Sequence, residues 1–237
     1  MKAIVPAAGK GTRLRPLTDD TPKGLVEVAG RPLLSHVCEA LLALGTSEII
    51  IVIGYEGGQI RDAFGEAFRG TPIRYVEQHD QRGLAHAILR GNGHVNGPFL
   101  VLNGDNVFET PPAKIRATVH DETADGVLVV ERAPPDIVSE GGAVFTEKGE
   151  VTKVIEKPDS TTTNLVTTGC YLLPSEFMEV GSTISPSPRG ELELADAINA
   201  LIDRGCRFVP VYYEGWRRNV NSQGDIAAVE ERLDPGI

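Results

Sequence analysis

The chain has no long apolar run. None of its hydrophobic stretches reaches the roughly 20 residues that a membrane-spanning helix needs. Met1 and Lys2 are followed by only a few apolar residues before the sequence turns polar, a pattern that does not fit a signal peptide. We therefore expect a cytoplasmic protein without a membrane as partner.

Cysteine is scarce as well. Cys38, Cys170 and Cys206 are an odd number of widely spaced residues, and no second Cys or His stands near them at metal-ligand spacing. This argues against a disulfide framework and against a Cys/His metal site. We expect buried free thiols.

Positive charge is in deficit, with 23 Lys and Arg against 33 Asp and Glu and a formal net charge of −10. Proteins that bind nucleic acid usually carry a basic face, so a nucleic acid is not expected as a partner. A net-negative protein that binds an anion must gather its cations locally, usually with a divalent metal to help.

Such a local gathering follows the first apolar run, 3–6, which predicts a buried strand. The small-residue loop 7–12 comes next, and its Gly9 and Gly11 have no Cβ, so the backbone can adopt positive φ and approach a ligand closely. Three cationic side chains accompany the loop: Arg13, Arg15 and Lys23. The combination predicts a polyphosphate-binding loop.

Two other glycine-rich loops do not fit. A Walker A loop needs four residues between its first Gly and a Gly-Lys-Ser/Thr, and that spacing does not occur. A dinucleotide fingerprint would need a third Gly where Leu14 stands. Taken alone, the loop could still be a glycine-rich turn whose cations are merely solvated.

The hydrophobic pattern predicts an α/β fold. Residues 32–44 have helical spacing and 48–54 form a β-branched run typical of a buried strand. The alternation continues through a helix at 59–68, a strand at 73–78, a helix at 84–91, a strand at 99–103 and a helix at 112–119. It indicates a mostly parallel sheet with helices on both faces.

From Gly126 onward the pattern changes to a smaller β-rich extension. Strand-like segments occur at 127–130, 143–145, 151–156 and 166–173, and we expect mixed or antiparallel pairing among them. A helix at 192–202, a strand at 208–213 and a helix at 225–233 follow.

The most informative acidic residue is Asp105, which follows the apolar strand 99–103 and Gly104. A carboxylate at the carboxyl end of a strand lies where open α/β sheets bind ligands. It could hold Mg²⁺, which takes oxygen ligands and bridges protein carboxylates to substrate phosphates. The alternative is that Asp105 only caps the turn.

The segment Ala7-Ala8-Gly9-Lys10-Gly11-Thr12-Arg13-Leu14-Arg15-Pro16-Leu17-Thr18, with Pro22-Lys23 after it, resembles the signature of sugar-1-phosphate nucleotidyltransferases, the glucose-1-phosphate thymidylyl- and uridylyltransferase group. The resemblance implies a Rossmann-like fold and one nucleotidyltransferase domain over 1–237, with a nucleotide-binding half (1–125) and a sugar-binding and metal-completing half (126–237). No hexapeptide repeat occurs, so we expect no C-terminal β-helix domain.

The resemblance also assigns roles to individual residues. Catalysis would fall to Arg13, Lys23 and Asp105. Nucleotide binding would involve Ala8, Gly9, Gly11, Thr12, Gln78 and Gly83, and the sugar phosphate would meet Gly142, Glu156, Lys157, Asn164, Thr168 and Arg189. Individually many of these are ordinary turn or cap residues, and their order along the chain is what supports the assignment.

One position departs from the family pattern. Relatives usually show Trp-x-Asp-Val/Ile-Gly, whose Asp is the second metal ligand, and this chain has Asn219 there. The expected Mg²⁺ ligands are then Asp105 and Asn219. An amide oxygen brings no negative charge, which leaves open weaker catalysis, an engineered inactivation or a natural pseudo-enzyme.

The implied reaction transfers a nucleotidyl group from a nucleoside triphosphate, UTP or dTTP, to a sugar 1-phosphate such as glucose 1-phosphate. The attacking phosphate is already ionised, so positioning and charge stabilisation suffice without a general base. A catalytically impaired nucleotide-sugar-binding protein and a phosphocholine cytidylyltransferase-like enzyme are the alternatives. The resemblance also allows for homo-oligomers.

Overall fold

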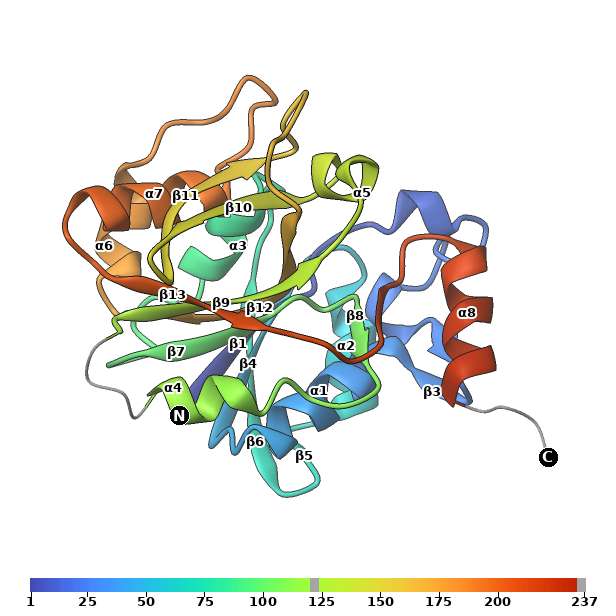
Figure 1. Cartoon of the computed structure of the whole chain (residues 1–237). Helices are drawn as coiled ribbons and strands as arrows, with labels where there is room; N and C mark the ends of the chain where they lie inside the picture. Colours follow the sequence, from blue (N-terminus) through green and yellow to red (C-terminus); the bar gives the residue numbers. More distant parts are fainter. Residues whose placement is uncertain (120–123, 234–237) are drawn as a thin grey trace. The chain divides into compact units, whose positions relative to one another are not determined.

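The computed structural model describes residues 1–119 and 124–233 (Figure 1). The chain forms two compact units, each assembled from separate segments. The first contains Met1–Gln81, Leu102–Pro111 and Gly215–Ile237, and the second contains Arg82–Val101 and Pro112–Glu214. The expected halves, 1–125 and 126–237, were defined by nucleotide binding and sugar binding, whereas these units are defined by compactness and divide the chain at other points. The division by binding role therefore stays a prediction.

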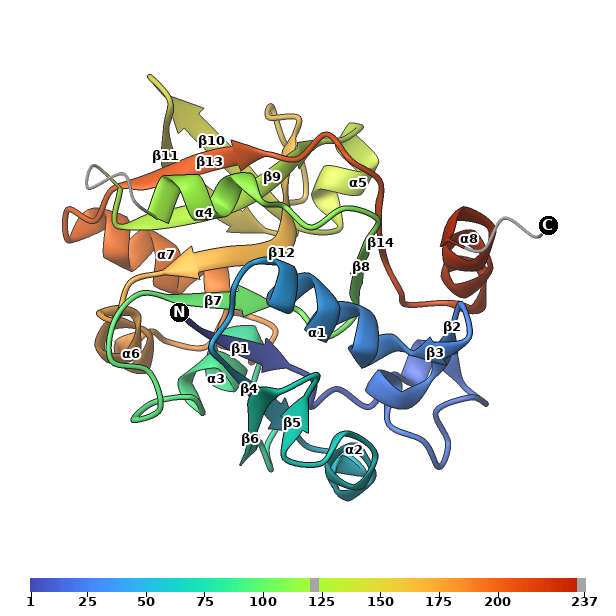
Figure 2. The same ribbon diagram turned by 90° about the horizontal axis from the view of Figure 1, so that it is seen from below.

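The first unit is organised by parallel strands. β1 (Lys2–Pro6) pairs in parallel with β4 (Glu48–Ile53), and β4 pairs in parallel with β6 (Thr71–Glu77). The short β5 (Ala67–Phe68) runs antiparallel to β6. The apolar β-branched residues that predicted β4 are buried, as a strand covered on both faces requires. α1 (Leu33–Ala43) and α2 (Gly57–Phe64) are the helices of this part of the chain (Figure 2).

Short elements complete the first unit around a second apolar cluster. β2 (Glu27–Val28) pairs with β3 (Arg31–Pro32), and β8 (Asn106–Phe108) pairs antiparallel with β14 (Arg217–Asn219). Two 3₁₀ helices, Thr12–Leu14 and Lys23–Leu25, and the last helix, α8 (Gln223–Leu233), belong here too. Leu14, Val107, Val220 and Val229 are buried together, with Trp216 against them.

The second unit is the β-rich part. β9 (Gly126–Arg132), β10 (Gly142–Glu147), β11 (Glu150–Glu156) and β12 (Leu165–Leu173) pair antiparallel, in the order β11-β10-β12-β9. β13 (Phe208–Tyr212) joins in parallel to β9, and β7 (Phe99–Leu102) neighbours β12.

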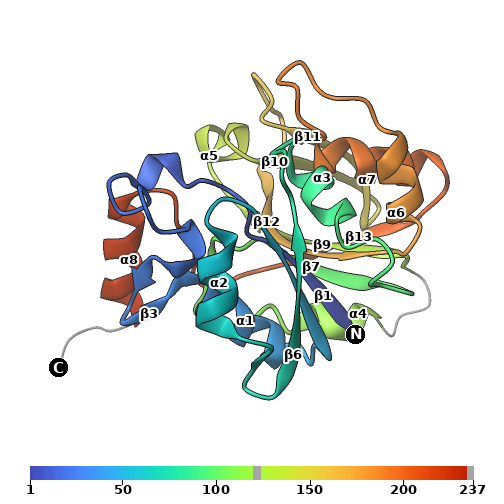
Figure 3. The same cartoon turned by 180° about the vertical axis from the view of Figure 1, so that it is seen from behind.

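The helices of the second unit are α3 (Leu84–Leu89), α4 (Lys114–Val119), α5 (Pro135–Ser139), α6 (Phe177–Val180) and α7 (Leu194–Asp203), with a 3₁₀ turn at Gly181–Thr183. α7 contacts α3, α6 and β11 (Figure 3). Its face of Leu194, Ala197, Ile198 and Leu201 is buried, as the helical spacing predicts.

The expected α/β fold with a mixed, mostly parallel sheet is confirmed. The differences lie at element ends and in short elements that the pattern did not predict, among them β8, α5, α6 and β14. The helix predicted over 59–68 ends at Phe64, because Gly65 follows with φ +62° and closes it, and Ala67–Phe68 form β5 instead. Within the described residues no helix is long and apolar enough to cross a membrane. Cys38 and Cys170 are buried free thiols as expected, and burial raises the pKa of each to about 12. Cys206 is a free thiol but only half-buried, because it lies in the turn between α7 and β13.

Candidate active site

The glycine-rich loop adopts the left-handed backbone that its sequence predicts, at one of its two glycines. Gly11 has φ +62°, and a Cβ there would lie 3.0 Å from both Lys23 Cβ and Thr18 Cγ2. The buried Thr18 hydroxyl donates to the Gly11 carbonyl at 2.8 Å. Thr12 begins the 3₁₀ helix that follows. Gly9 is exposed, and a Cβ there would meet nothing within 4 Å.

The other end of the loop is held against the ends of β4 and β6. The Gln81 side chain donates from Nε2 to the Ala8 carbonyl at 2.7 Å. A Cβ on Gly54 would lie 2.8 Å from Ala8 Cβ and 3.1 Å from the Gln78 carbonyl, so only glycine permits this approach. Gln78, expected to read the base, is buried with 4% exposure.

Gly83 belongs to the second unit and has φ +100°. A Cβ there would lie 2.7 Å from the Leu192 carbonyl oxygen, so glycine is required for the contact between this turn and the start of α7. The Arg82 carbonyl accepts from the Leu192 N–H at 2.7 Å and the Leu192 carbonyl accepts from the Ala85 N–H at 3.0 Å.

Three segments far apart in the chain meet at one polar cluster in the first unit, which we call the Lys23 cluster: Arg13, Lys23, Asp105 and Asn221. The Lys23 ammonium lies 2.7 Å from Asp105 Oδ2 and donates to Asn221 Oδ1 at 3.0 Å. Arg13 donates from Nη2 to the same amide oxygen at 2.9 Å. The three expected catalytic residues are thus brought together, and Asn221 joins them.

Backbone hydrogen bonds fix the cluster in place. The Gly104 N–H donates to the Pro6 carbonyl at 3.0 Å, and a Cβ on Gly104 would lie 2.7 Å from that oxygen, so glycine is needed just before Asp105. On the other side the Val220 N–H donates to the Asp105 carbonyl at 2.9 Å. Asp105 is therefore held between the end of β1 and the chain that follows β14.

Asn221 was missed by the sequence analysis, which had assigned the metal-site position to Asn219. Asn219 is an exposed residue of β14 and pairs in register with Asn106. Its role as a ligand remains a prediction, whereas the amide oxygen in the Lys23 cluster belongs to Asn221. Asn221 lies two residues beyond the end of β14, so the alternation of a strand does not reach it, and no local pattern in the sequence marks it.

The Lys23 cluster has the donor set that a hard divalent cation prefers. Asp105 Oδ2 and Asn221 Oδ1 both converge on one positive group, the Lys23 ammonium. Among the described residues no group of three or more His, Cys, Asp or Glu could hold a metal. Mg²⁺ commonly uses one or two protein oxygens and completes its shell with water and substrate phosphates, so these residues fit it.

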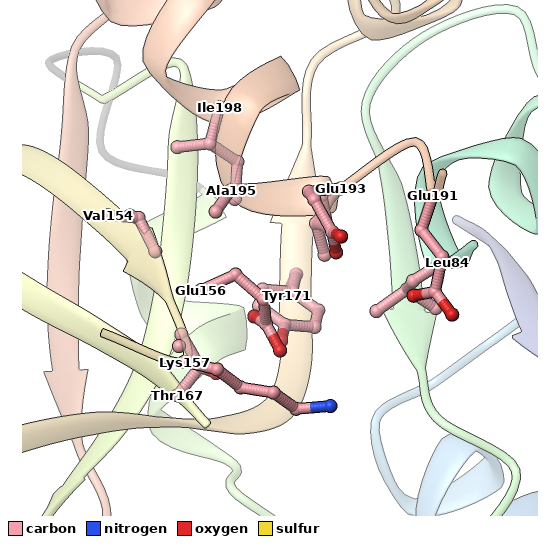
Figure 4. Close-up of a pocket in the computed structure, with 12 residues that line it drawn as sticks. Leu84, Val154, Glu156, Lys157, Thr167, Tyr171, Glu191, Glu193, Ala195 and Ile198 are labelled. Carbon is pink, nitrogen blue, oxygen red and sulfur yellow. The ribbon is translucent and has the colours of Figure 1, made fainter. Parts of the chain in front are cut away.

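The second unit contains a pocket of about 210 Å³ between β10, β11, β12 and α7 (Figure 4). Its lining residues are Leu84, Gly142, Val154, Glu156, Lys157, Thr167, Tyr171, Glu191, Glu193, Leu194, Ala195 and Ile198. Three of the residues expected at the sugar phosphate, Gly142, Glu156 and Lys157, are therefore brought together.

β11 ends at Glu156 beside the pocket, and Lys157 is the first residue after the strand. Burial raises the pKa of the Glu156 carboxyl above its usual range, against the opposing pull of the Lys157 charge. Lys157 has φ +45°, which turns the chain sharply at the strand end, and its N–H donates to the Gly141 carbonyl at 2.8 Å. Figure 4 shows the Glu156 carboxylate and the Lys157 ammonium extending from this turn into the pocket.

Glu193 is a buried carboxylate of the pocket that the sequence analysis missed. Its Oε1 accepts from the Ser187 hydroxyl at 2.7 Å and from Arg189 Nη2 at 2.9 Å. Arg189 does not line the pocket itself and is tied to it through this ion pair.

Besides Arg189, two predicted sugar-site residues do not line the pocket. The Thr168 hydroxyl is buried and donates to the Val129 carbonyl at 2.9 Å, whereas the neighbouring Thr167 faces the pocket and its Oγ1 would lie 2.9 Å from a Cβ on Gly142. Asn164 is exposed, and its Oδ1 accepts from Arg132 at 3.2 Å. Their assignment to sugar binding rests on the resemblance alone.

Comparison with known proteins identifies the family of this chain. The model of the nucleotidyl transferase family matches residues 2–217. The chain belongs to the sugar-1-phosphate nucleotidyltransferases. It is thus an enzyme of the nucleotidyl-transfer class, as the loop signature predicted.

Several relatives match nearly the whole chain. UTP–glucose-1-phosphate uridylyltransferase AglF of Haloferax volcanii is 39% identical over 234 residues, 98% of this chain and 96% of that protein. A glucose-1-phosphate thymidylyltransferase of Streptomyces antibioticus is 32% identical over 243 residues, 100% of this chain and 68% of that protein. The chain spans only 54% of the bifunctional protein GlmU of Methanococcus maripaludis, with 32% identity.

Solved structures agree on the fold. A UDP-glucose pyrophosphorylase complexed with UDP-glucose superposes with a TM-score of 0.88 at 24% identity, covering 99% of this chain and 98% of that one. The pyrophosphorylase from Acinetobacter baumanii gives 0.85 at 22% identity, covering 98% and 92%. At this level of identity the likeness establishes the shared fold.

Proposed function

We propose that the protein makes UDP-glucose, with UTP as nucleotidyl donor and glucose 1-phosphate as acceptor. The choice of UTP over dTTP rests on the uridylyltransferase relative, which is 39% identical and matches end to end. The observation that carries the chemistry is the meeting of Lys23, Asp105 and Asn221 at one point beside the left-handed Gly11 turn.

In this reaction an oxygen of the sugar phosphate forms a bond to the α-phosphorus of the triphosphate. The bond from that phosphorus to its bridging oxygen breaks, and the electron pair leaves with pyrophosphate. No proton has to be removed from the nucleophile, so the work of the protein is positioning and charge stabilisation.

Each charged residue has a role in that work. The loop N–H groups around Gly11 would hold the phosphates, and Arg13 would stabilise the negative charge that grows on the leaving group. Lys23 would turn from Asp105 to the α-phosphate when substrate binds. Lys157 would hold the attacking phosphate and Glu156 would accept hydrogen bonds from sugar hydroxyls.

Asp105 and Asn221 would hold Mg²⁺, with Asn221 in place of the expected Asn219. When bound, this ion neutralises phosphate charge and orients the triphosphate. A single protein carboxylate in this set predicts modest affinity for the free ion and stronger binding together with the nucleotide.

The test is a panel of UTP, dTTP, CTP and ATP against glucose 1-phosphate, other sugar 1-phosphates and phosphocholine, with Mg²⁺ and with pyrophosphate release as readout. We expect the highest kcat/KM for UTP with glucose 1-phosphate. Release with dTTP alone would move the assignment to a thymidylyltransferase. Binding of UDP-glucose without any release would favour the impaired binding protein, and release with CTP and phosphocholine would favour the cytidylyltransferase.

We further propose that the enzyme works in the cytoplasm, where both substrates are available, and that neither nucleic acid nor a membrane is a partner. The net charge of −10 and the lack of a long apolar run support this. Self-association is open to measurement by light scattering.

A further inference from the structure

The Asp225 side chain accepts several hydrogen bonds from the turn between β14 and α8. Its Oδ2 accepts three hydrogen bonds: from the Asn221 N–H at 3.0 Å, the Ser222 N–H at 2.8 Å and the Ser222 hydroxyl at 2.8 Å. The Asp225 N–H in turn donates to Ser222 Oγ at 3.2 Å. Ser222 and Asp225 thus form a capping box at the start of α8.

A capping box ordinarily satisfies the N-cap residue and the third residue of the helix, and here it reaches one residue further back. That extra residue is Asn221, whose side chain accepts from Lys23 and Arg13. The preceding residue, Val220, is buried and bonded to the Asp105 carbonyl. The backbone of Asn221 is therefore fixed by Val220 on one side and by Asp225 on the other.

We propose that Asp225 is a positioning residue of the metal and phosphate site: it holds the Asn221 backbone so that the Asn221 amide oxygen stays in the Lys23 cluster. The role of Asn221 as a metal ligand rests on the proposed function, and the role of Asp225 rests on the three hydrogen bonds to Asn221 and Ser222. Removal of a residue that orients a metal ligand without touching the metal typically lowers metal affinity 10–100-fold.

The test compares three single variants in the full chain. Asp225→Ala removes the anchor of the Asn221 N–H. Ser222→Ala weakens the same helix cap but leaves the Asn221 N–H bonded to Asp225, so it is the matched control for lost capping. Asp225→Asn keeps an acceptor oxygen at the same place and serves as the conservative variant if the alanine variant does not fold.

The first readout is Mn²⁺ binding to the protein without nucleotide, followed by the signal of free Mn²⁺ in electron paramagnetic resonance. We expect about tenfold or greater weakening for Asp225→Ala, little change for Ser222→Ala, and partial retention for Asp225→Asn. Both alanine variants should lower the melting temperature because each loses a helix cap, and Asp225→Ala should lower it more, because it also loses the Asn221 N–H bond and the ion pair between Arg218 Nε and Asp225 Oδ1 at 3.5 Å.

The second readout is the Mg²⁺ dependence of pyrophosphate release from UTP and glucose 1-phosphate. Asp225→Ala should need about tenfold more Mg²⁺ for half-maximal rate and should recover most of its kcat at high Mg²⁺. Equal Mn²⁺ affinity in Asp225→Ala and Ser222→Ala would overturn the proposal. If the unmodified protein released no pyrophosphate, the proposed function would fail, and the Mn²⁺ comparison would still decide the role of Asp225.

Discussion

The Lys23 cluster and the pocket around Glu156 handle charge in opposite ways. In the Lys23 cluster every charged group has an opposite or polar partner, because Lys23 lies against Asp105 and shares the Asn221 oxygen with Arg13. The pocket is acidic: Glu156, Glu191 and Glu193 line it, and Lys157 is the lining cation.

This difference suits two kinds of ligand. When a polyphosphate and its metal bind, they replace the ion pairs within the cluster with ion pairs to the ligand. The charged groups of the protein are therefore paired with one another before the ligand binds. A sugar offers hydroxyl donors, and carboxylates are the strongest acceptors for them. The cluster is therefore expected to act mainly on turnover, and the pocket mainly on the affinity for the sugar phosphate.

The largest effect should separate the two cations. Lys23→Met should lower kcat about hundredfold to thousandfold, as loss of one electrostatic stabiliser does. Because Asp105 then loses its resident partner, Mn²⁺ should bind more tightly in the absence of nucleotide. Lys157→Met should instead raise the KM for glucose 1-phosphate more than it lowers kcat. Steady-state kinetics with both substrates varied checks this, and equal kinetic defects in the two variants would remove the distinction.

A smaller effect should arise from the backbone of the loop. Gly11→Ala places a Cβ 3.0 Å from Lys23 Cβ in a residue with φ +62°, so we expect about 1–2 kcal/mol of lost stability and a lower kcat through displaced Lys23. Gly9→Ala is the control, since a Cβ there meets nothing within 4 Å. Urea unfolding measures both. A Gly11→Ala protein as stable as Gly9→Ala would contradict the prediction.

The sequence predicts some residues of the Lys23 cluster better than others. The loop, Lys23 and Asp105 were predictable because a local pattern, glycine with adjacent cations or an apolar strand before Gly-Asp, specifies the local backbone. Asn221 was not, because its place depends on β8 and β14, strands of three residues each, which carry too little periodicity to be detected.

The difference between Thr167, which lines the pocket, and Thr168, which does not, has a similar physical cause. Alternation along a strand decides which side chain faces a pocket, and a single irregularity reverses it. β12 shifts its register against β9 between Thr167 and Tyr171, and Gly169 within it has φ +79°. The order of helices and strands can be predicted despite such irregularities. The side of the strand on which one side chain lies cannot.

The raised pKa of Glu156 predicts a pH dependence confined to the pocket. A buried carboxyl whose pKa is raised by folding favours its neutral form, so stability is fully present below the unfolded pKa of about 4.3 and falls as pH rises through the raised value. Glu156→Gln stays neutral, so its stability relative to the unmodified protein should grow across that window and then level off.

Thermal unfolding from pH 4 to pH 8 in about half-unit steps, fine enough to resolve one titration, measures this difference. The same substitution at Glu147, which is exposed and does not line the pocket, serves as the control for the loss of a surface carboxylate. If the difference in stability between Glu156→Gln and the unmodified protein were the same at every pH, burial of Glu156 would not destabilise its ionised form.

The smallest effect tests the backbone turn that directs Lys157 into the pocket. Its φ of +45° is costly for any residue with a Cβ, so Lys157→Gly should be more stable than Lys157→Ala by about 1 kcal/mol. Both variants lose the ammonium and should share the same raised KM for glucose 1-phosphate.

Lys153, in the strand β11 that leads into this turn, gives the opposite expectation. It is an exposed residue of β11 outside the pocket lining, paired with Phe145 and without positive φ. There Gly should be less stable than Ala by about 0.5–1 kcal/mol, because glycine loses more chain entropy on folding. Chemical denaturation of the four variants gives both differences. If the difference in stability between Gly and Ala has opposite signs at the two positions, the backbone at Lys157 is strained, and the pocket has a charged residue there despite that strain. If the difference has the same sign at both positions, the turn carries no strain.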